Sequence, residues 1–153
     1  VAAADAVMVG VETIIADDSG LRDRSGHRRN PYRVVLDTNL RIPPTARIIS
    51  ENEDARSIVV TTSSQSIDGV RTIRANRDGE HIDLRDAMKR LAELGIIDVL
   101  LESGRTLGNA MVTGGLVRRL IVLQAPRLLA GGSGRIRAID QIGCDGRIVV
   151  DLA

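Results

Sequence analysis

Apolar residues gather in short runs that end at glycine, aspartate or a hydroxyl-rich turn. Short runs rich in Val, Ile and Leu are typical of strands buried on both faces of a parallel sheet. The pattern predicts strands at residues 6–9, 33–36, 57–61, 70–74, 96–101, 120–124 and 148–150. Pro43 and Pro44 exclude a regular element between Leu40 and Ala46.

Helical spacing fills several of the gaps between these runs. In the clearest case, residues 84–92, apolar side chains recur every three or four positions. Asp83 precedes this segment as an N-cap, and Gly95 follows it where a helix favours a left-handed residue. Shorter helices are predicted at residues 11–16 and 105–112. The alternation of strands and helices predicts an α/β fold with a mostly parallel central sheet flanked by helices.

Composition and charge exclude several classes of protein. The 153 residues fit one domain, so residues 1–153 are expected to form a single domain. Tyr32 is the only aromatic residue, which argues against the base-stacking modules that bind nucleic acid. The 21 basic and 20 acidic side chains are interspersed, and no apolar run reaches membrane-spanning length. We therefore expect no nucleic-acid or membrane partner, and the lone Cys144 fits a reducing, cytoplasmic location.

The turn after residues 96–101 is the sharpest candidate for chemistry. Glu102, Ser103 and Gly104 lead the chain into a predicted helix whose first amides would face an anion. The pattern fits a phosphate cradle, although its glycine spacing differs from the dinucleotide and Walker motifs. An ordinary strand–helix turn explains the same residues. Glu102 is correspondingly either a ligand for a polar substrate or a solvated charge at the sheet edge.

Other polar clusters also follow predicted strands, at the edge where parallel sheets bind ligands. Thr13 with Asp17 and Asp18 offers acceptors for ribose or amide donors, or serves only as a turn. Arg41 and the hydroxyl groups of residues 61–64 suit an adenosine 2′-phosphate, and they equally fit ordinary turns. We expect Gly10, Asp37, the loop that begins at Thr62, and residues 102–104 to lie along one rim. Arginines crowd the loop that follows Asp18, and they either grip a substrate phosphate or are simply solvated: Arg22, Arg24, Arg28 and Arg29. His27 and His81 have no partners at metal-ligand spacing, so no metal site is predicted.

Four segments of the chain, taken in order, resemble one known family. They are residues 8–18 with Leu21, residues 30–43, residues 101–107, and residues 115–117 running to 125–129. They are similar to the reductase domain of riboflavin biosynthesis, which is fused to a deaminase in bacteria and free-standing in archaea. Each motif alone has low specificity, whereas four motifs at compatible spacing span nearly the whole chain.

The resemblance implies a dihydrofolate-reductase-like fold, NADPH as hydride donor and a ribosylamino-pyrimidine 5′-phosphate as substrate. Hydride would reach C1′ of the open-chain ribose and give a ribitylamino product. The protein would align the reacting carbons and exclude water. The resemblance also implies a homodimer, for which residues 120–123 are one candidate contact. The chain is expected to lack the family's first strand and its C-terminal end.

The resemblance also assigns binding residues. Cofactor contacts are expected at Thr13, Asp17, Thr38, Leu40, Arg41, Ile42, Pro43, Ile82, Gly104, Arg105, Thr106 and Leu107. Residues 104–107 among them match the turn that holds the pyrophosphate. Substrate contacts are expected at Glu102, Leu21 and Arg24.

A few positions depart from the family pattern. Ser19 stands where proline is usual, Arg105 where a small residue is usual, and Arg118 with Arg119 where an acidic pair is common. Two alternatives therefore stay open. One is a related NADPH-dependent reductase of another substrate, and the other is a non-catalytic nucleotide-binding subunit of the same fold. The sequence also leaves open NADPH against NADH, and whether reduction precedes deamination.

Overall fold

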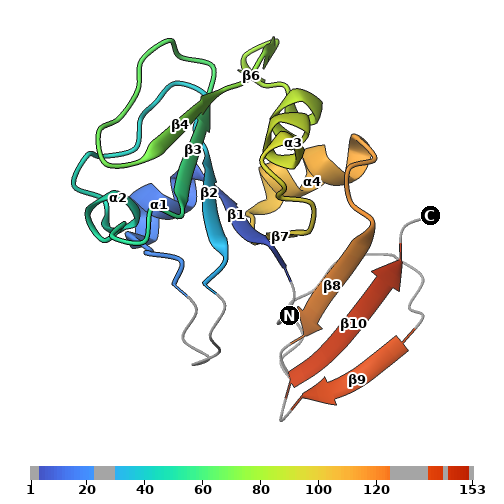
Figure 1. The fold of residues 1–153 in the computed structure, drawn as a ribbon. Helices are drawn as coiled ribbons and strands as arrows, with labels where there is room; N and C mark the ends of the chain where they lie inside the picture. The colour runs from blue at the N-terminus through green and yellow to red at the C-terminus, as the bar shows by residue number, and fades with distance from the viewer. Residues whose placement is uncertain (1–3, 23–29, 125–137, 143–144, 152–153) are drawn as a thin grey trace. The chain divides into compact units, whose positions relative to one another are not determined.

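The computed structural model describes residues 4–22, 30–124, 138–142 and 145–151 (Figure 1). The chain divides into two compact units, Val1–Asn109 and Ala110–Ala153. The first unit contains a parallel sheet, and the second contains a smaller antiparallel sheet. Within the described residues, no helix is both long and apolar enough to cross a membrane.

The first unit is built on a five-stranded sheet in the order β4-β3-β2-β1-β7. Every neighbouring pair of strands in it is parallel. The predicted parallel α/β sheet is therefore confirmed. Its strands are β1 (Ala6–Gly10), β2 (Tyr32–Leu36), β3 (Ser57–Thr61), β4 (Arg71–Arg74) and β7 (Val99–Leu101).

The strand predicted at residues 96–101 is wrong in its first half, because β7 begins only at Val99. The backbone N–H groups of Ile97 and Asp98 both donate to Asp5 Oδ2, each at 2.9 Å. The Asp5 carboxylate thus accepts from two backbone N–H groups that would otherwise bond to a neighbouring strand. The apolar run in the sequence does not reveal this competition.

The predicted helices are present, with α1 (Val11–Asp17) following β1 and α4 (Arg105–Thr113) following β7. The longest helix, α3 (Leu84–Glu93), begins at Asp83, whose side chain accepts the N–H groups of Arg85 and Asp86 as expected for an N-cap. Gly95 follows it with φ +79°, a left-handed conformation as predicted. Three short elements were not predicted: α2 (Arg47–Ser50), β5 (Arg77–Asp78) and β6 (His81–Ile82).

The strand register divides the apolar side chains between the two faces of the sheet. Val9, Val35 and Val59 are aligned on one face and belong to one buried cluster. Met8 and Val34, aligned on the opposite face, are 0% exposed. Figure 1 shows α1 and α2 on one side of the sheet and α3 on the other. The helices contribute Val11 and Ile14 from α1, Ile48 and Ile49 from α2, and Ala87 and Leu91 from α3 to the buried residues.

The second unit contains three antiparallel strands in the order β8-β10-β9. They are β8 (Arg119–Gln124), β9 (Ala138–Ile142) and β10 (Asp145–Asp151). The predicted strands at 120–124 and 148–150 are confirmed, whereas β9 was not predicted.

Asp37 shapes the chain where β2 leaves the sheet. Its side chain is fully buried, and its Oδ2 accepts the backbone N–H of Ile42 at 2.8 Å. Its own N–H donates to Val60 O at 2.9 Å, and its carbonyl accepts the N–H of Leu40. The carboxylate therefore closes a loop that contains no helix or strand, over residues 37–42.

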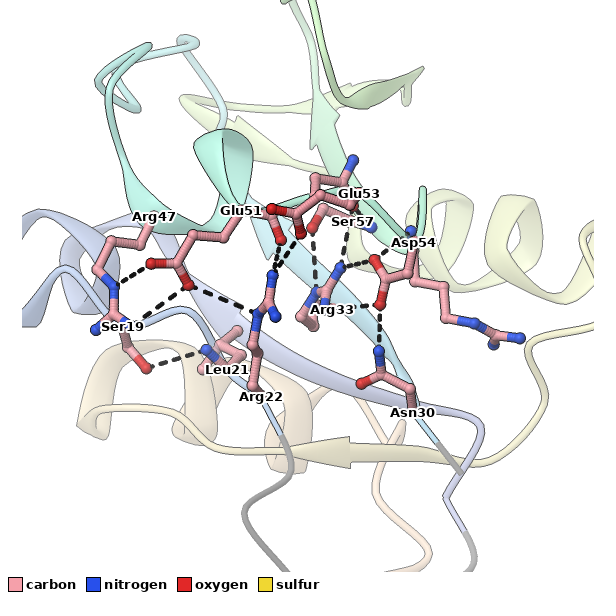
Figure 2. Close-up of polar contacts among 12 residues, drawn as sticks. Ser19, Leu21, Arg22, Asn30, Arg33, Arg47, Glu51, Glu53, Asp54 and Ser57 are labelled. Carbon is pink, nitrogen blue, oxygen red and sulfur yellow. Dashed lines mark hydrogen bonds and ion pairs between the residues drawn. The ribbon is translucent and has the colours of Figure 1, made fainter. Parts of the chain in front are cut away.

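Arg33 organises the opposite end of the sheet, where β2 and β3 begin (Figure 2). Only 1% exposed, it donates from Nε to Ser57 Oγ at 3.1 Å. Its other nitrogens bind Asn52 Oδ1 at 3.0 Å and both carboxylate oxygens of Asp54. Asn30 also donates to Asp54. The buried guanidinium therefore has both a counter-ion and hydrogen-bond acceptors, as a buried charge requires.

The Asp37→Ala variant should lower the free energy of unfolding by about 1–3 kcal/mol, because it leaves the buried N–H of Ile42 without its acceptor. Urea denaturation at pH 7 measures the change. The exposed Asp68 provides a matched control, for which Asp68→Ala should change stability by less than about 0.5 kcal/mol. Equal stability of the two variants would contradict the role assigned to Asp37.

Asp54 should make the stability of the protein depend on acid pH. Burial acts to raise the pKa of Asp54, but hydrogen bonds from Arg33 and the Arg56 backbone together bring it below its usual value. Because the pKa is lower in the folded state, this contribution to stability is complete above about pH 4 and is lost as the pH falls through the lowered pKa.

We therefore expect Asp54→Asn to reduce the free energy of unfolding at pH 7 by about 1–3 kcal/mol. The difference between the variant and the wild type should shrink at pH 3. Urea titrations at both pH values provide the measurement, with Asp68→Asn as the control. A difference of the same size at the two pH values would rule out the charge of Asp54 as its origin.

Candidate functional site

The strands of the first unit place four polar segments along one rim. Because β3, β2, β1 and β7 are adjacent and parallel, their carboxyl ends lie in a row. Thr62, Asp37, Gly10 and Glu102 are at or directly after these ends. The predicted rim is therefore confirmed, and it is the edge at which open α/β sheets bind ligands.

The turn from β7 into α4 leaves backbone donors unpaired at this rim. The first hydrogen bond of the helix runs from the N–H of Gly108 to the carbonyl of Gly104, at 3.1 Å. The amides of residues 105–107 precede that bond, and no described residue accepts from them. A Cβ added at Gly104 would meet no atom within 4 Å. No described side chain blocks the space in front of this glycine, and the free amides suit an anion.

Two glycines allow close packing around this turn. A Cβ at Gly108 would lie 3.1 Å from Ser103 Oγ, which is a tight contact. A Cβ at Gly10 would lie 3.6 Å from Leu107 Cδ2, an ordinary contact. The starts of α1 and α4 are therefore neighbours. The sequence did not indicate Gly108. This position favours glycine because Ser103, five positions earlier, leaves little room for a side chain.

Thr13 and Asp17 lie four residues apart on α1, so they share one helical face. Thr13 is half-buried and Asp17 is exposed. Asp18, which follows in a left-handed conformation with φ 44°, accepts the backbone N–H of Arg47 at 2.9 Å. Asp18 therefore binds the first backbone amide of α2. This is a structural role, as in the alternative that Asp17 and Asp18 serve only as a turn.

Hydroxyl groups hold the segment after β2 against the end of β3. The carbonyl of Thr38 accepts from Thr61 Oγ1 at 3.1 Å and from Thr62 Oγ1 at 2.9 Å. Leu40, with φ 56°, is half-buried against the core cluster that contains Val35. Further along, Ile42 is buried and Pro43 is exposed.

Arg41 forms an ion pair with Glu12 of α1. The hydrogen bond to Glu12, together with its negative charge, raises the pKa of Arg41. Both side chains are exposed, so water screens the pair. The carboxylate nevertheless compensates the one positive charge that the sequence suggested for an adenosine phosphate.

The predicted substrate residues occupy different environments. Glu102 is exposed at the rim, and its N–H donates to Met8 O at 2.9 Å. Leu21 packs partly buried against the core cluster of Val9, Val35 and Val59. Its neighbour Arg22 donates to the carbonyl of Glu51 and to Glu53 Oε2, as Figure 2 shows. Arg24 lies outside the described residues.

Of the remaining predicted cofactor residues, Arg105 and Thr106 are exposed, and Leu107 is half-buried. Ile82 is buried on β6, where it pairs with Arg77 of β5. Arg77 Nη2 in turn donates to Asn39 Oδ1 and Thr62 Oγ1, each at 3.0 Å. The structure thus adds Arg77 and Asn39 to the rim, and neither was among the predicted site residues.

Known proteins with similar sequences and structures are named as RibD or as a pyrimidinone phosphate reductase. The riboflavin biosynthesis protein RibD of Actinobacillus pleuropneumoniae is 31% identical over 150 residues, which cover 89% of this chain and 40% of that protein. The 2,5-diamino-6-ribosylamino-4(3H)-pyrimidinone 5′-phosphate reductase of Methanothermobacter thermautotrophicus is 34% identical over 149 residues, which cover 92% of this chain and 68% of that enzyme.

A solved structure supports the same relationship. RibD from Acinetobacter baumannii superposes with a TM-score of 0.78 at 29% identity, covering 97% of this chain and 46% of that chain. The predicted dihydrofolate-reductase-like α/β fold is thereby confirmed. The family model described as the RibD C-terminal domain matches residues 1–152, and the chain belongs to that family.

Proposed function

We propose that this chain is an NADPH-dependent reductase of riboflavin biosynthesis, which converts the ribose of a ribosylamino-pyrimidine 5′-phosphate to the ribitylamino form. The single observation that carries the proposal is the open turn at residues 104–107. Among the described residues, none accepts from its amides, and none lies within 4 Å of a Cβ added at Gly104. The chain spans 40% of the A. pleuropneumoniae protein and 68% of the archaeal reductase that it matches.

The residues at the rim fit a phosphorylated dinucleotide. The free amides of residues 105–107 would receive its diphosphate. Thr13 and Asp17, on the neighbouring helix, offer a hydroxyl and a carboxylate to the nicotinamide half. The segment 38–43 would support the adenosine half, since its backbone is fixed by Asp37 and by the hydroxyl groups at the end of β3. When bound, NADPH supplies the hydride.

The substrate would lie beside Glu102, at the same rim. An exposed carboxylate accepts hydrogen bonds from amino or hydroxyl groups of a polar substrate. The family resemblance also gives Leu21 and Arg24 as substrate contacts. Leu21 lies beside Arg22, which binds Glu51 at the opposite end of the sheet, so Leu21 does not join Glu102 at the rim in this structure. The chain's task is then to hold C1′ of the open-chain ribose against the hydride donor and to exclude water. We further propose a cytoplasmic homodimer, on the strength of the family relationship.

The proposed function requires that the chain bind NADPH. Titration followed by NADPH fluorescence should show saturable binding with one site per chain. With a ribosylamino-pyrimidine 5′-phosphate present, absorbance at the reduced-nicotinamide band should fall as ribitylamino product forms. Binding without turnover would favour the non-catalytic alternative, and absence of binding would refute the proposed function.

Gly104→Ala and Gly104→Val should weaken NADPH binding by at least about tenfold, with the larger loss for valine. The new side chain would occupy the space that the diphosphate needs, while a Cβ at this position would meet no described atom within 4 Å. Thermal unfolding should consequently change little. Gly20→Ala is the matched control, because a Cβ there makes only ordinary contacts and lies away from the four strand ends. Unchanged affinity in both Gly104 variants would show that the diphosphate binds elsewhere.

A further inference from the structure

Arg77 joins two strand ends at the rim. It lies on β5, and its Nη2 donates to Asn39 Oδ1 and to Thr62 Oγ1, both at 3.0 Å. Asn39 follows β2, and Thr62 follows β3 directly. The guanidinium is therefore fixed at the part of the rim that the adenosine half of a dinucleotide would occupy.

The remaining hydrogen-bond donors of Arg77 are available to a ligand. A guanidinium has five N–H donors, and the two contacts use the pair on Nη2. Nε and Nη1 bind no acceptor among the described residues. Thr62 Oγ1 already donates to Thr38 O and accepts from Arg77. The hydroxyl proton of Thr62 is therefore already used and cannot be donated to an anion. Arg77 is the residue of this pair that still has N–H groups for an anion.

The surroundings of Arg77 are positively charged. It lines a hollow of about 370 Å³ together with Arg74, Ala75, Asn76 and Arg90. Arg90 is neutralised by Asp86, which it binds at 2.9 Å. Within the described part of the chain, neither Arg74 nor Arg77 forms an ion pair. Two uncompensated guanidinium groups beside a hollow suit a phosphate dianion.

The short hairpin that carries Arg77 is anchored on both sides. Ile82, opposite Arg77 on β6, is buried, and Asp83 N–H donates to Asn76 O at 2.9 Å. Asp86 of α3 accepts the N–H of Asn76 at 2.6 Å. These contacts fix the backbone on which Arg77 stands.

We propose that Arg77 selects NADPH over NADH by binding the 2′-phosphate of the adenosine, a role that Arg41 cannot fill as well because Glu12 already compensates its charge. This assignment rests on the proposed function, since it supposes a dinucleotide along the rim. Asn39 and Thr62 act as positioning residues, because they hold the guanidinium fork in place.

Direct binding measurements on the full chain test this assignment. NADPH and NADH are titrated by fluorescence into the wild type, Arg77→Gln, Arg77→Lys and Arg71→Gln. Arg77→Gln should weaken NADPH binding by about 10- to 100-fold and leave NADH binding unchanged. Arg77→Lys should show a smaller loss, because it keeps the charge without the fork. Arg71, exposed at the other end of β4, is the matched control and should have no effect.

A second arm identifies the source of the phosphate, since the proposed substrate also carries one. Adenosine 2′-monophosphate should compete with NADPH for the wild type and lose this ability in Arg77→Gln. Ribose 5-phosphate should compete equally weakly with both proteins. If the Arg77→Gln substitution abolishes competition by ribose 5-phosphate but not by adenosine 2′-monophosphate, Arg77 binds the substrate phosphate and the assignment is wrong.

The outcomes separate this assignment from the proposed function. A wild type that binds NADPH and NADH equally, or an Arg77→Gln variant that loses both equally or neither, overturns the assignment and leaves the reductase intact. A wild type that binds neither dinucleotide overturns both. Thermal unfolding of each variant confirms that the exposed substitutions leave the fold unchanged.

Discussion

The parallel alignment of β3, β2, β1 and β7 is the constraint on which the candidate site depends. Parallel strands all leave the sheet at the same edge, so their last backbone groups must find partners there. Asp37 supplies one at the end of β2, and the hydroxyl groups of Thr61 and Thr62 bind the carbonyl of Thr38. After β7 the N–H of Glu102 pairs with Met8 O, but no described residue accepts from the amides of residues 105–107 at the start of α4. The proposed diphosphate site lies at these amides.

The two ends of the sheet therefore serve different purposes. At the end where β2 and β3 begin, Arg33 is buried with Asp54, Asn52 and Ser57, and its polar groups are satisfied within the protein. At the opposite end, Arg77 is held by two hydrogen bonds and keeps its other donors for solvent or ligand. The hydrogen bonds of Arg33 are all made within the protein, so this arginine serves the fold. Arg77 keeps unpaired N–H groups, and a ligand can form hydrogen bonds only with groups that the fold has left unpaired.

The sequence was sufficient for most of the sheet and for the position of the rim, because apolar runs and helix caps are local signals. The start of β7 was not predictable, since it depends on Asp5, more than 90 residues away. The hairpin carrying Arg77 was missed because two-residue strands of polar composition have no periodicity. The rim turn at residues 104–107 could be recognised as a candidate because a glycine between a strand and a helix is again a local signal.

The choice between Arg41 and Arg77 illustrates what the sequence leaves out. Both are exposed arginines near strand ends, and nothing local distinguishes them. Glu12, 29 positions before Arg41, compensates its charge, whereas Asn39, 38 positions before Arg77, orients its fork without neutralising it. A neutral acceptor such as Asn39 holds an arginine in place, so the arginine loses less conformational entropy when it binds a phosphate. A carboxylate such as Glu12 instead weakens the electrostatic attraction between the arginine and the phosphate. The identity of the partner therefore decides which arginine can recognise an anion, and only the fold determines that partner.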